Sequence, residues 1–313
     1  MMTVQGIDES GAADLARRAP AGARRRWRPG GTWWPFALPA LVLVAAFFVL
    51  PFILNLRLAF TDWSSFSDEI AWNGLDNFKL LIEQNILIES LRVTLIYAVV
   101  AMLLQNVVSL SLALLLQETN FINSVFRSLF FLPVLISSVA AGYIWFALLS
   151  PNGPFNQAIA MIMPGFSHAW FGDVSTALGA VAFTDVWKSS GIVTLVYIAG
   201  LNAIPHELIE AATIDGASAW QRFAKIRFPL LAPALTFTVV ITLIGAINAF
   251  DIAMATTRGG PGTATTVLNL AMQQQWNTGF YGTGSALSLT ITLIVVLTAV
   301  PLVAYLRSRE VAL

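Results

Sequence analysis

The segment that begins at His206 comes close to a zinc-binding motif. It reads HELIE, so Glu210 stands where the second histidine of H-E-x-x-H would be. Two imidazoles one helical turn apart hold the zinc in that motif, and this segment supplies one. The chain's other histidine, His168, is far away in the sequence. We therefore expect neither a zincin nor any other histidine-built metal site.

Other chemistry is excluded by what the sequence lacks. Cysteine is absent, which rules out disulfides, thiolate metal sites and a cysteine nucleophile. No Gly-Lys pair occurs, so the chain has no Walker A loop to bind the phosphates of a nucleotide. The serine elbow G-x-S-x-G is missing too. We expect no enzyme activity, no catalytic residue and no cofactor bound by this chain.

Polar residues inside apolar stretches are the remaining candidates for chemistry. Asp185 and Lys188 are three residues apart, so they would share one face of a helix. Both are costly to leave facing lipid, so they either pair with each other or line a polar path. Asn248 and Asp251 are also three apart, toward the end of a later apolar stretch. These four residues are our candidates for a substrate path.

The elements that position these residues must lie in a membrane. Of the 313 residues 57% are hydrophobic and 11% are charged, with a mean hydropathy of +0.74, far too apolar for a soluble domain. The net charge of zero predicts no attraction to nucleic acid. Six runs have about the length that a bilayer core requires; they cover residues 36–59, 91–116, 125–149, 177–202, 230–256 and 284–306.

We therefore predict an all-α polytopic membrane protein with six transmembrane helices. Residues 1–35 would form a basic tail, residues 36–90 the first helix and an outer segment, and residues 91–313 a core of five helices. Pro133 in the third run and Pro233 in the fifth can each kink a helix. A disordered cytoplasmic tail is favoured over a nucleic-acid-binding one for residues 1–35.

Basic residues are distributed unevenly between the segments that flank these runs. With the N-terminus inside, twelve lie on the inner side: Arg17, Arg18, Arg24, Arg25, Arg26, Arg28, Arg127, Arg222, Lys225, Arg227, Arg307 and Arg309. Three lie on the outer side: Lys79, Arg92 and Arg258. Because cytoplasmic loops retain an excess of Lys and Arg, we predict that both termini are cytoplasmic. The connection between the fourth and fifth runs would be cytoplasmic as well.

That connection is polar and suits two short helices. Pro205 is a good first-turn residue, and the acidic residues that follow favour the N-terminal part of a helix, which predicts a helix over about 205–214. Gly216 can take the left-handed conformation that closes a helix. Ser218 and Gln221 have the spacing of a capping box that opens a second helix, and Pro229 is expected to end it.

The residues of this connection carry a resemblance to a known family. Glu210-Ala211-Ala212, Asp215-Gly216-Ala217, Ile226 and Pro229 resemble the "EAA" loop of the membrane permease subunits of binding-protein-dependent ABC importers. The surrounding letters, IPHELIEAATIDGASAWQRF, most resemble the branch that imports carbohydrates, which includes maltose-type and glycerol phosphate systems. The similarity runs over about residues 91–306. Phe228 departs from the usual Leu before the closing proline.

This resemblance implies a permease subunit of an ATP-driven importer in a bacterial or archaeal plasma membrane, with a sugar or oligosaccharide as cargo. A separate ATPase dimer, which would bind ATP and Mg²⁺, grips the loop in such systems. Glu210 would make polar contacts in its groove, Ala211 and Ala212 would allow close approach, and Asp215 with Gly216 would shape the turn. A second related permease subunit, an extracytoplasmic substrate-binding protein and membrane lipid are the further implied partners, and no nucleic acid is.

Sugars are bound by amides, carboxylates and hydroxyls, with aromatic rings against their apolar faces. The runs and their outer connections offer both kinds of group: Asn248, Asp251, Asn269, Gln273 and Gln274, and Tyr143, Trp145, Trp187 and Phe250. Aromatic residues near span ends more often form interface belts. Two rival interpretations stay open: a secondary transporter that uses an ion gradient through Asp185, Lys188 and Asp251, and a membrane scaffold that transports nothing.

Overall fold

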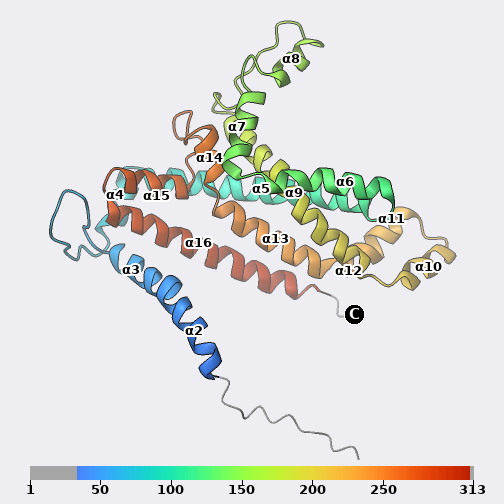
Figure 1. Ribbon diagram of the computed structural model, residues 1–313, viewed down its shortest axis with the longest axis horizontal. Coiled ribbons are helices and arrows are strands. Elements are labelled where there is room, and N and C mark those ends of the chain that lie inside the picture. The colour runs from blue at the N-terminus through green and yellow to red at the C-terminus, as the bar shows by residue number, and fades with distance from the viewer. Residues whose placement is uncertain (1–33, 311–313) are drawn as a thin grey trace, which may run out of the picture. The chain divides into compact units, whose positions relative to one another are not determined.

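Helices make up the fold of the computed structural model in the part of the chain that it describes, residues 34–310 (Figure 1). The only strand-like feature there is an isolated bridge between Thr61 and Trp72. The chain divides into two compact units, Met1–Pro51 and Phe52–Leu313. The predicted tail lies almost wholly outside the described residues.

The first predicted span is one helical run. It consists of α2 (Trp34–Val44), a π turn (Ala45–Val49) and α3 (Leu50–Leu58), which continues across the boundary between the units. Residues Ala37–Leu58 are long and apolar enough to cross a membrane. The predicted span 36–59 agrees with Ala37–Leu58 to within a residue at each end.

Four long helices form the frame of the second unit: α5 (Ile86–Leu116), α9 (Ala177–Asn202), α13 (Ala232–Ile247) and α16 (Tyr281–Arg307). Helix α5 packs against α9 and α13, and α13 packs against α16 (Figure 1). Small residues permit this close approach, as at Gly200 of α9, where a Cβ atom would lie 2.6 Å from the Cβ of Ala234. The predicted spans at 91–116, 177–202 and 284–306 correspond to α5, α9 and α16.

The third predicted span, 125–149, is broken. It comprises α6 (Phe121–Phe131), a 3₁₀ turn (Leu132–Leu135) and α7 (Ser138–Leu148), and its two parts meet at an angle of 103°. Pro133 lies in the 3₁₀ turn, where its missing N–H weakens the helix, and the Ser137 side chain accepts a hydrogen bond from Ala140 N and so starts α7 afresh. The chain does bend near Pro133, as expected, but the break itself lies at residues 136–137, and α7 points away from the long helices (Figure 1).

The fifth predicted span, 230–256, is too long. Helix α13 ends at Ile247, residues 248–250 are not helical, and the separate short helix α14 (Asp251–Thr256) packs against α7. The Asn248 side chain donates a hydrogen bond to Ile244 O over 2.9 Å, a local bond that competes with continuation of the helix. The break is the reason that residues of α9 and of this segment can surround a common space.

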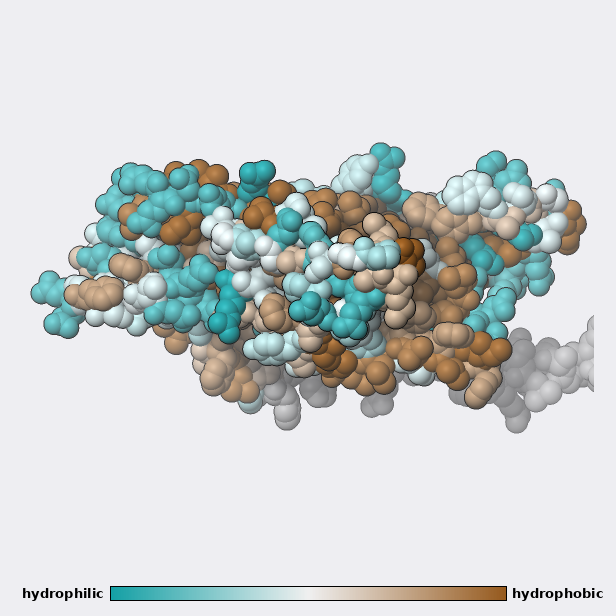
Figure 2. Space-filling view, turned by 90° about the horizontal axis from the view of Figure 1, so that it is seen from above, coloured by the Kyte–Doolittle hydropathy of each residue, from teal (hydrophilic) through white to brown (hydrophobic). Residues whose placement is uncertain are grey.

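Shorter helices cap this frame. They are α4 (Asp76–Glu83), α8 (Pro154–Ala160), α10 (His206–Ile214), α11 (Ala219–Arg222), α12 (Phe228–Leu230) and α15 (Leu268–Asn277). In the space-filling view of Figure 2, hydrophilic residues gather over the two ends of the second unit and hydrophobic ones cover much of the surface between them. This is the pattern of a protein whose middle faces lipid.

Three helical runs in the described residues can each cross a membrane by length and composition. The number reaches six when each sharply bent pair counts as one span. Two of these pairs involve the polar connection: α9 bends by 67° into α10, and the run Ala219–Leu230 bends by 68° into α13. The all-α prediction is confirmed, and six is the upper count of its spans.

Candidate functional site

The polar connection forms a helix pair, residues 205–230, at one end of the second unit (Figure 1). Its first helix, α10, ends in a complete Schellman motif. Gly216 has φ of +76°, its N–H donates to Thr213 O, and Ala217 N donates to Ala212 O. Added bulk at Gly216 would meet no atom within 4 Å, so only the backbone conformation demands glycine there.

The second helix of the pair opens with the predicted capping box. Gln221 N donates to Ser218 Oγ and Ser218 N donates to Gln221 Oε1. Helix α11 then continues through a π turn (Phe223–Arg227) into α12. Pro229 does not end this helix: it lies in the final turn, and the bend follows at Leu231. The wide π turn just before Pro229 accommodates a residue that has no N–H to donate.

The inner side of the helix pair is fixed to the long helices. Ile209 and Leu230 pack against a buried apolar cluster that contains Leu201 of α9 and Leu231. The two helices are also joined to each other, because Arg222 Nη1 donates to Thr213 Oγ1 over 3.0 Å. A force on the pair is therefore borne by α9 and α13.

The outer side of the pair is free in this chain. Among the predicted contact residues Glu210, Ala211, Asp215 and Gly216 are exposed, whereas Ala212, Ala217, Ile226 and Pro229 are partly buried. The two alanines thus differ, since Ala211 is open to a partner and Ala212 is turned partly toward its own chain. Ile214 is 87% exposed and Trp220 is 72% exposed. Large apolar side chains that stay exposed on a polar loop are typical of a surface that a partner covers.

A polar cavity of about 160 Å³ lies where α9 passes the break after α13. Three of the four candidate substrate-path residues line it: Asp185, Asn248 and Asp251. Lys188 does not. Of the aromatic and amide groups proposed for sugar contact, Phe250 and Asn248 are in its wall. Asn269, Gln273, Gln274, Tyr143, Trp145 and Trp187 are not among its lining residues.

Asp185 is held by two hydroxyl groups. Tyr97 Oη donates to its Oδ2 over 2.8 Å, and Ser189 Oγ donates to its Oδ1 over 3.3 Å. No ion pair joins Asp185 to Lys188 in the structure, so mutual pairing does not explain these two residues. Tyr97 is 1% exposed and lines the same cavity. Tyr97 was not predicted from the sequence, although a single phenol within an apolar helix is a usable signal.

A closed ring of hydrogen bonds, the polar ring, lies in the three long helices nearest the helix pair. Tyr197 Oη donates to Asn106 Oδ1 over 2.6 Å, and Thr238 Oγ1 donates to Tyr197 Oη over 2.7 Å. Asn106 Nδ2 donates to Thr242 Oγ1 over 2.8 Å, and Thr242 Oγ1 donates to Thr238 O. All four side chains are at least nine-tenths buried. The ring therefore ties α5, α9 and α13 together without any charge.

The fold and the site define a polytopic helical membrane protein with a paired-helix loop at one end and a polar cavity among its long helices. The chain belongs to the family of binding-protein-dependent transport system inner membrane components, whose model matches residues 105–312. The resemblance of the polar connection to permease subunits is thereby confirmed.

Relatives cover most of the chain. It is 32% identical over 284 residues to the probable starch degradation products transport system permease protein AmyD of Thermoanaerobacterium thermosulfurigenes. This alignment covers 90% of this chain and 96% of the relative. It is 33% identical over 277 residues to the trehalose/maltose transport system permease protein MalF of Thermococcus litoralis, covering 88% and 93%. In fold it resembles a bacterial ABC transporter involved in the import of the acidic polysaccharide alginate, with a TM-score of 0.77, 20% identity and coverage of 96% and 99%.

Proposed function

We propose that this chain is a permease subunit of an ATP-driven importer for a sugar or oligosaccharide, which moves its cargo by alternating access. A partner ATPase dimer docks on the helix pair and moves it during the nucleotide cycle. The observation that carries the proposal is that the helix pair is joined at both ends to α9 and α13, the two helices that border the polar cavity. The relatives of the chain are named as sugar-transport permeases.

The helix pair is linked to the polar cavity through the long helices on either side of it in the chain. Helix α9 carries Asp185 in the wall of the cavity and is joined to α10 by three residues, across the 67° bend. Helix α13 starts just after α12 and ends at the break that supplies Asn248 and Asp251. Both ends of the helix pair are therefore attached to the helices whose far parts form the cavity. The polar ring lies between the two regions, so α9 and α13 would move together rather than slide past each other.

The docking surface has the chemistry that a groove in another protein can use. Ile214 and Trp220 present apolar anchors, Glu210 and Asp215 present carboxylates, and Ala211 allows a close approach. ATP and Mg²⁺ would be bound by the partner, because this chain has no Walker A sequence. On this proposal the helix pair and both termini are cytoplasmic, in the plasma membrane of a prokaryote.

The cavity in one chain is small, which fits a path shared with a second, related permease subunit. Substrate would arrive from an extracytoplasmic binding protein, the partner that the family description itself names. Asp185, Asn248 and Asp251 would accept or donate hydrogen bonds to hydroxyl groups as the cargo passes, and Phe250 would supply an aromatic surface.

The test is reconstitution in lipid vesicles with candidate ATPase subunits, a second permease and binding protein from the same organism. Uptake of labelled maltose or trehalose is measured with ATP on the side of the membrane that carries the ATPase, and again without ATP. We expect uptake only from the complete assembly with ATP. Uptake by the chain alone, driven by a proton or sodium gradient, would instead support a secondary transporter, and no uptake by any combination would support a scaffold.

A further inference from the structure

An apolar groove with a charged end lies between α13 and α16, and it is here called the α13–α16 groove. Its volume is about 470 Å³. The α13 side is formed by residues from Pro233 to Ile244, and the α16 side by Val303 and Arg307, with Glu310 just beyond the helix. Phe237 in this wall is 54% exposed, so the groove is open along its length. It shares no lining residue with the polar cavity at Asp185.

The groove has the length of one leaflet of a bilayer. Helix α13 is continuous over Ala232–Ile247, and Pro233 and Ile244 are eleven positions apart. At 1.5 Å per residue they are separated by about 17 Å along the helix axis. The hydrocarbon region of one leaflet is about 15 Å thick, half of the roughly 30 Å of the bilayer core. An acyl chain of a membrane lipid therefore matches the groove in length and in polarity.

A cation and an anion stand together at one end of the groove. Arg307 is the last residue of α16 and is exposed, and Glu310 is partly buried. Both belong to the end of the second unit near α12, where α13 also begins (Figure 1). Arginine at a membrane interface extends its apolar stem along the hydrocarbon and places its charge among the headgroups. The charged end of the groove thus has the position of a lipid headgroup.

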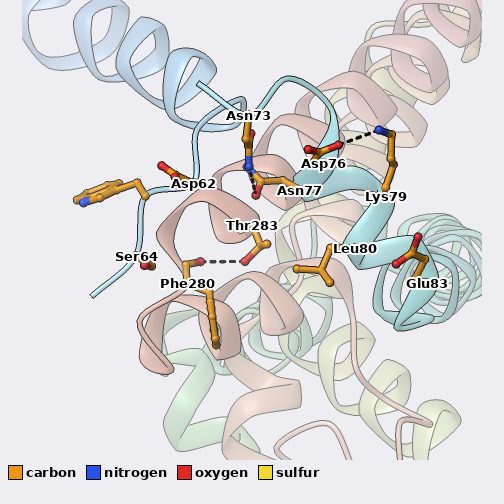
Figure 3. Close-up of a pocket in the computed structure, with 11 residues that line it drawn as sticks. Asp62, Ser64, Asn73, Asp76, Asn77, Lys79, Leu80, Glu83, Phe280 and Thr283 are labelled. Carbon is orange, nitrogen blue, oxygen red and sulfur yellow. Dashed lines mark hydrogen bonds and ion pairs between the residues drawn. The ribbon is translucent and has the colours of Figure 1, made fainter. Parts of the chain in front are cut away.

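The two charges do not neutralise each other. Within the described residues no ion pair joins Arg307 to Glu310, although they are three positions apart. Asp76 and Lys79 have the same spacing and do pair, over 2.7 Å (Figure 3). In that pair the acid comes first and both residues lie in α4, which is the favourable order within a helix. The order is reversed at the groove, and α16 ends between the two residues, so both charges stay available to a ligand.

A hydroxyl group lies in the wall near the charged end. Thr236 is 7% exposed, and its hydroxyl forms no hydrogen bond with another described residue, whereas the hydroxyls of Thr238 and Thr242 on the same helix donate to backbone carbonyls. The Thr236 hydroxyl is not among the fully enclosed atoms that lack a partner, so it can be reached from the groove. A donor left without an acceptor in an apolar wall is costly.

We propose that the α13–α16 groove binds one phospholipid whose headgroup carries a primary ammonium, as in phosphatidylethanolamine. The lipid phosphate accepts hydrogen bonds from Arg307, and the ammonium donates to the carboxylate of Glu310. An ester carbonyl of the lipid accepts from Thr236, and one acyl chain follows α13 as far as Ile244. The proposal concerns residues that the polar cavity does not use, and it does not depend on which cargo the chain transports.

Other occupants satisfy fewer of these groups. A purely anionic headgroup would be repelled by Glu310. A quaternary ammonium, as in phosphatidylcholine, has no N–H to donate to Glu310. An apolar helix of a second permease subunit would cover the groove but would leave Arg307, Glu310 and Thr236 without partners. Arg309 does not take part, since it lies outside the groove and its guanidinium is 5.5 Å from the centroid of the Tyr305 ring.

The experiment titrates the full-length chain, delipidated in detergent, with palmitoyl-oleoyl phosphatidylethanolamine, phosphatidylcholine or phosphatidylglycerol, and counts bound lipids by native mass spectrometry. We expect one phosphatidylethanolamine to bind about tenfold more tightly than either other lipid. Arg307→Gln should lower this affinity about tenfold and Thr236→Val about fivefold, the losses that follow from one charge-assisted and one neutral hydrogen bond.

Two matched controls should bind as the wild type does. Arg309→Gln removes an exposed charge from the same segment but outside the groove. Thr298→Val removes a hydroxyl that already donates to Ile294 O of its own helix. Glu310→Gln should abolish the preference for phosphatidylethanolamine and increase the binding of phosphatidylglycerol, a gain that misfolding cannot produce.

The proposal is overturned if the wild-type chain binds the three lipids equally, or if Arg307→Gln and Thr236→Val bind as the wild type does. Retention of the preference by Glu310→Gln would also overturn it. The titration is repeated on the chain assembled with a second permease subunit. Loss of the tight phosphatidylethanolamine in that complex would assign the groove to the interface between subunits, against the proposal, and its retention would support the lipid site.

Discussion

The helix pair and the polar cavity are built in opposite ways. The pair is made by neighbours in the sequence: Ser218 with Gln221 at one helix start, and Gly216 with Thr213 at the other helix end. Its outer face is exposed and includes apolar side chains. The cavity is made by segments that are far apart, as in the contact between Tyr97 and Asp185, which are 88 residues apart. Its wall joins the buried Tyr97 to the exposed Asn248 and Asp251.

This contrast indicates which substitutions should impair function while leaving the fold intact. Replacing an exposed side chain on the outer face of the pair removes nothing that holds the chain together, so it should act on a partner alone, whereas a change at Gly216 also distorts the turn that shapes the face. A substitution at the cavity or in the polar ring touches groups that other helices satisfy, so it can act on substrate, on stability or on both.

The largest effect is expected on the helix pair. Gly216→Pro is incompatible with φ of +76° and removes the N–H that donates to Thr213 O. The native turn is then less stable by about 3 kcal/mol or more, which would lower the population of the docking-competent loop about a hundredfold. Glu210→Arg reverses an exposed charge on the docking face. Both variants should lose ATP-driven uptake in vesicles and still insert in the membrane.

The matched controls for these variants are Gly165→Pro and Glu69→Arg. Gly165 is also an exposed glycine with a positive φ, +83°, and Glu69 is an exposed acid, but both lie away from the helix pair. Neither control should reduce uptake by much. Normal transport by Gly216→Pro and Glu210→Arg would refute the coupling role of the pair.

A smaller effect is expected in the polar cavity. Asp251→Asn keeps the side-chain size and removes a charged acceptor, so uptake should fall about tenfold. The variant should still bind the ATPase, because the helix pair is unchanged. Uptake and co-purification of the ATPase are measured on the same preparation, with Asp68→Asn as the control. Full uptake by Asp251→Asn and by Asp185→Asn would remove the cavity from the transport path.

The polar ring should influence stability more than binding. Thr242→Val leaves Asn106 Nδ2 without its bond to the Thr242 hydroxyl, whereas Thr290→Val removes only a hydroxyl that bonds Ala286 O of its own helix. Thermal unfolding in nanodiscs should therefore place Thr242→Val about 1 kcal/mol below Thr290→Val. Equal stability of the two variants would mean that the ring does not hold α5 to α13.

The smallest effect is expected at Lys188. It neither lines the polar cavity nor forms an ion pair with Asp185. Lys188→Ala should therefore keep uptake within about twofold of the wild type, the change that corresponds to about 0.5 kcal/mol. Kinetics of uptake at several sugar concentrations check this. A strong loss of substrate-stimulated uptake would bring Lys188 back into the path.

The local signals of the sequence predicted the helix pair, because its caps and turns depend on residues within a few positions. Gly216, Ser218 and Gln221 have the conformations and bonds that their spacing indicates. The six apolar runs were also predicted, since length and composition decide whether a segment can cross a bilayer. The end of the second helix of the pair was predicted slightly too early, at Pro229. The π turn before Pro229 lets the helix continue past the proline, and no residue pattern in the sequence indicates that turn.

The breaks at residues 136–137 and 248–250 were harder to predict, because apolar residues continue on both sides of each and one or two polar residues do not by themselves end a helix. The position of Tyr97 opposite Asp185, and the polar ring around Asn106, depend on how α5 packs against α9 and α13. No pattern within one helix specifies that register. The sequence indicates that Asp185, Asn248 and Asp251 are polar residues that are unfavourable in contact with lipid. That they line one cavity follows from tertiary packing.

The central claim is that a partner ATPase holds the exposed face of the helix pair, and it can be tested by site-specific cross-linking. The chain contains no cysteine, so Ala211→Cys introduces a single thiol on that face. In the assembled complex a short thiol-reactive cross-linker should join this cysteine to the ATPase and block uptake, whereas Ser167→Cys, in the exposed loop after α8, should give no such product. An assembled, active complex in which Ala211→Cys reacts freely with solvent and never with the ATPase would contradict the account.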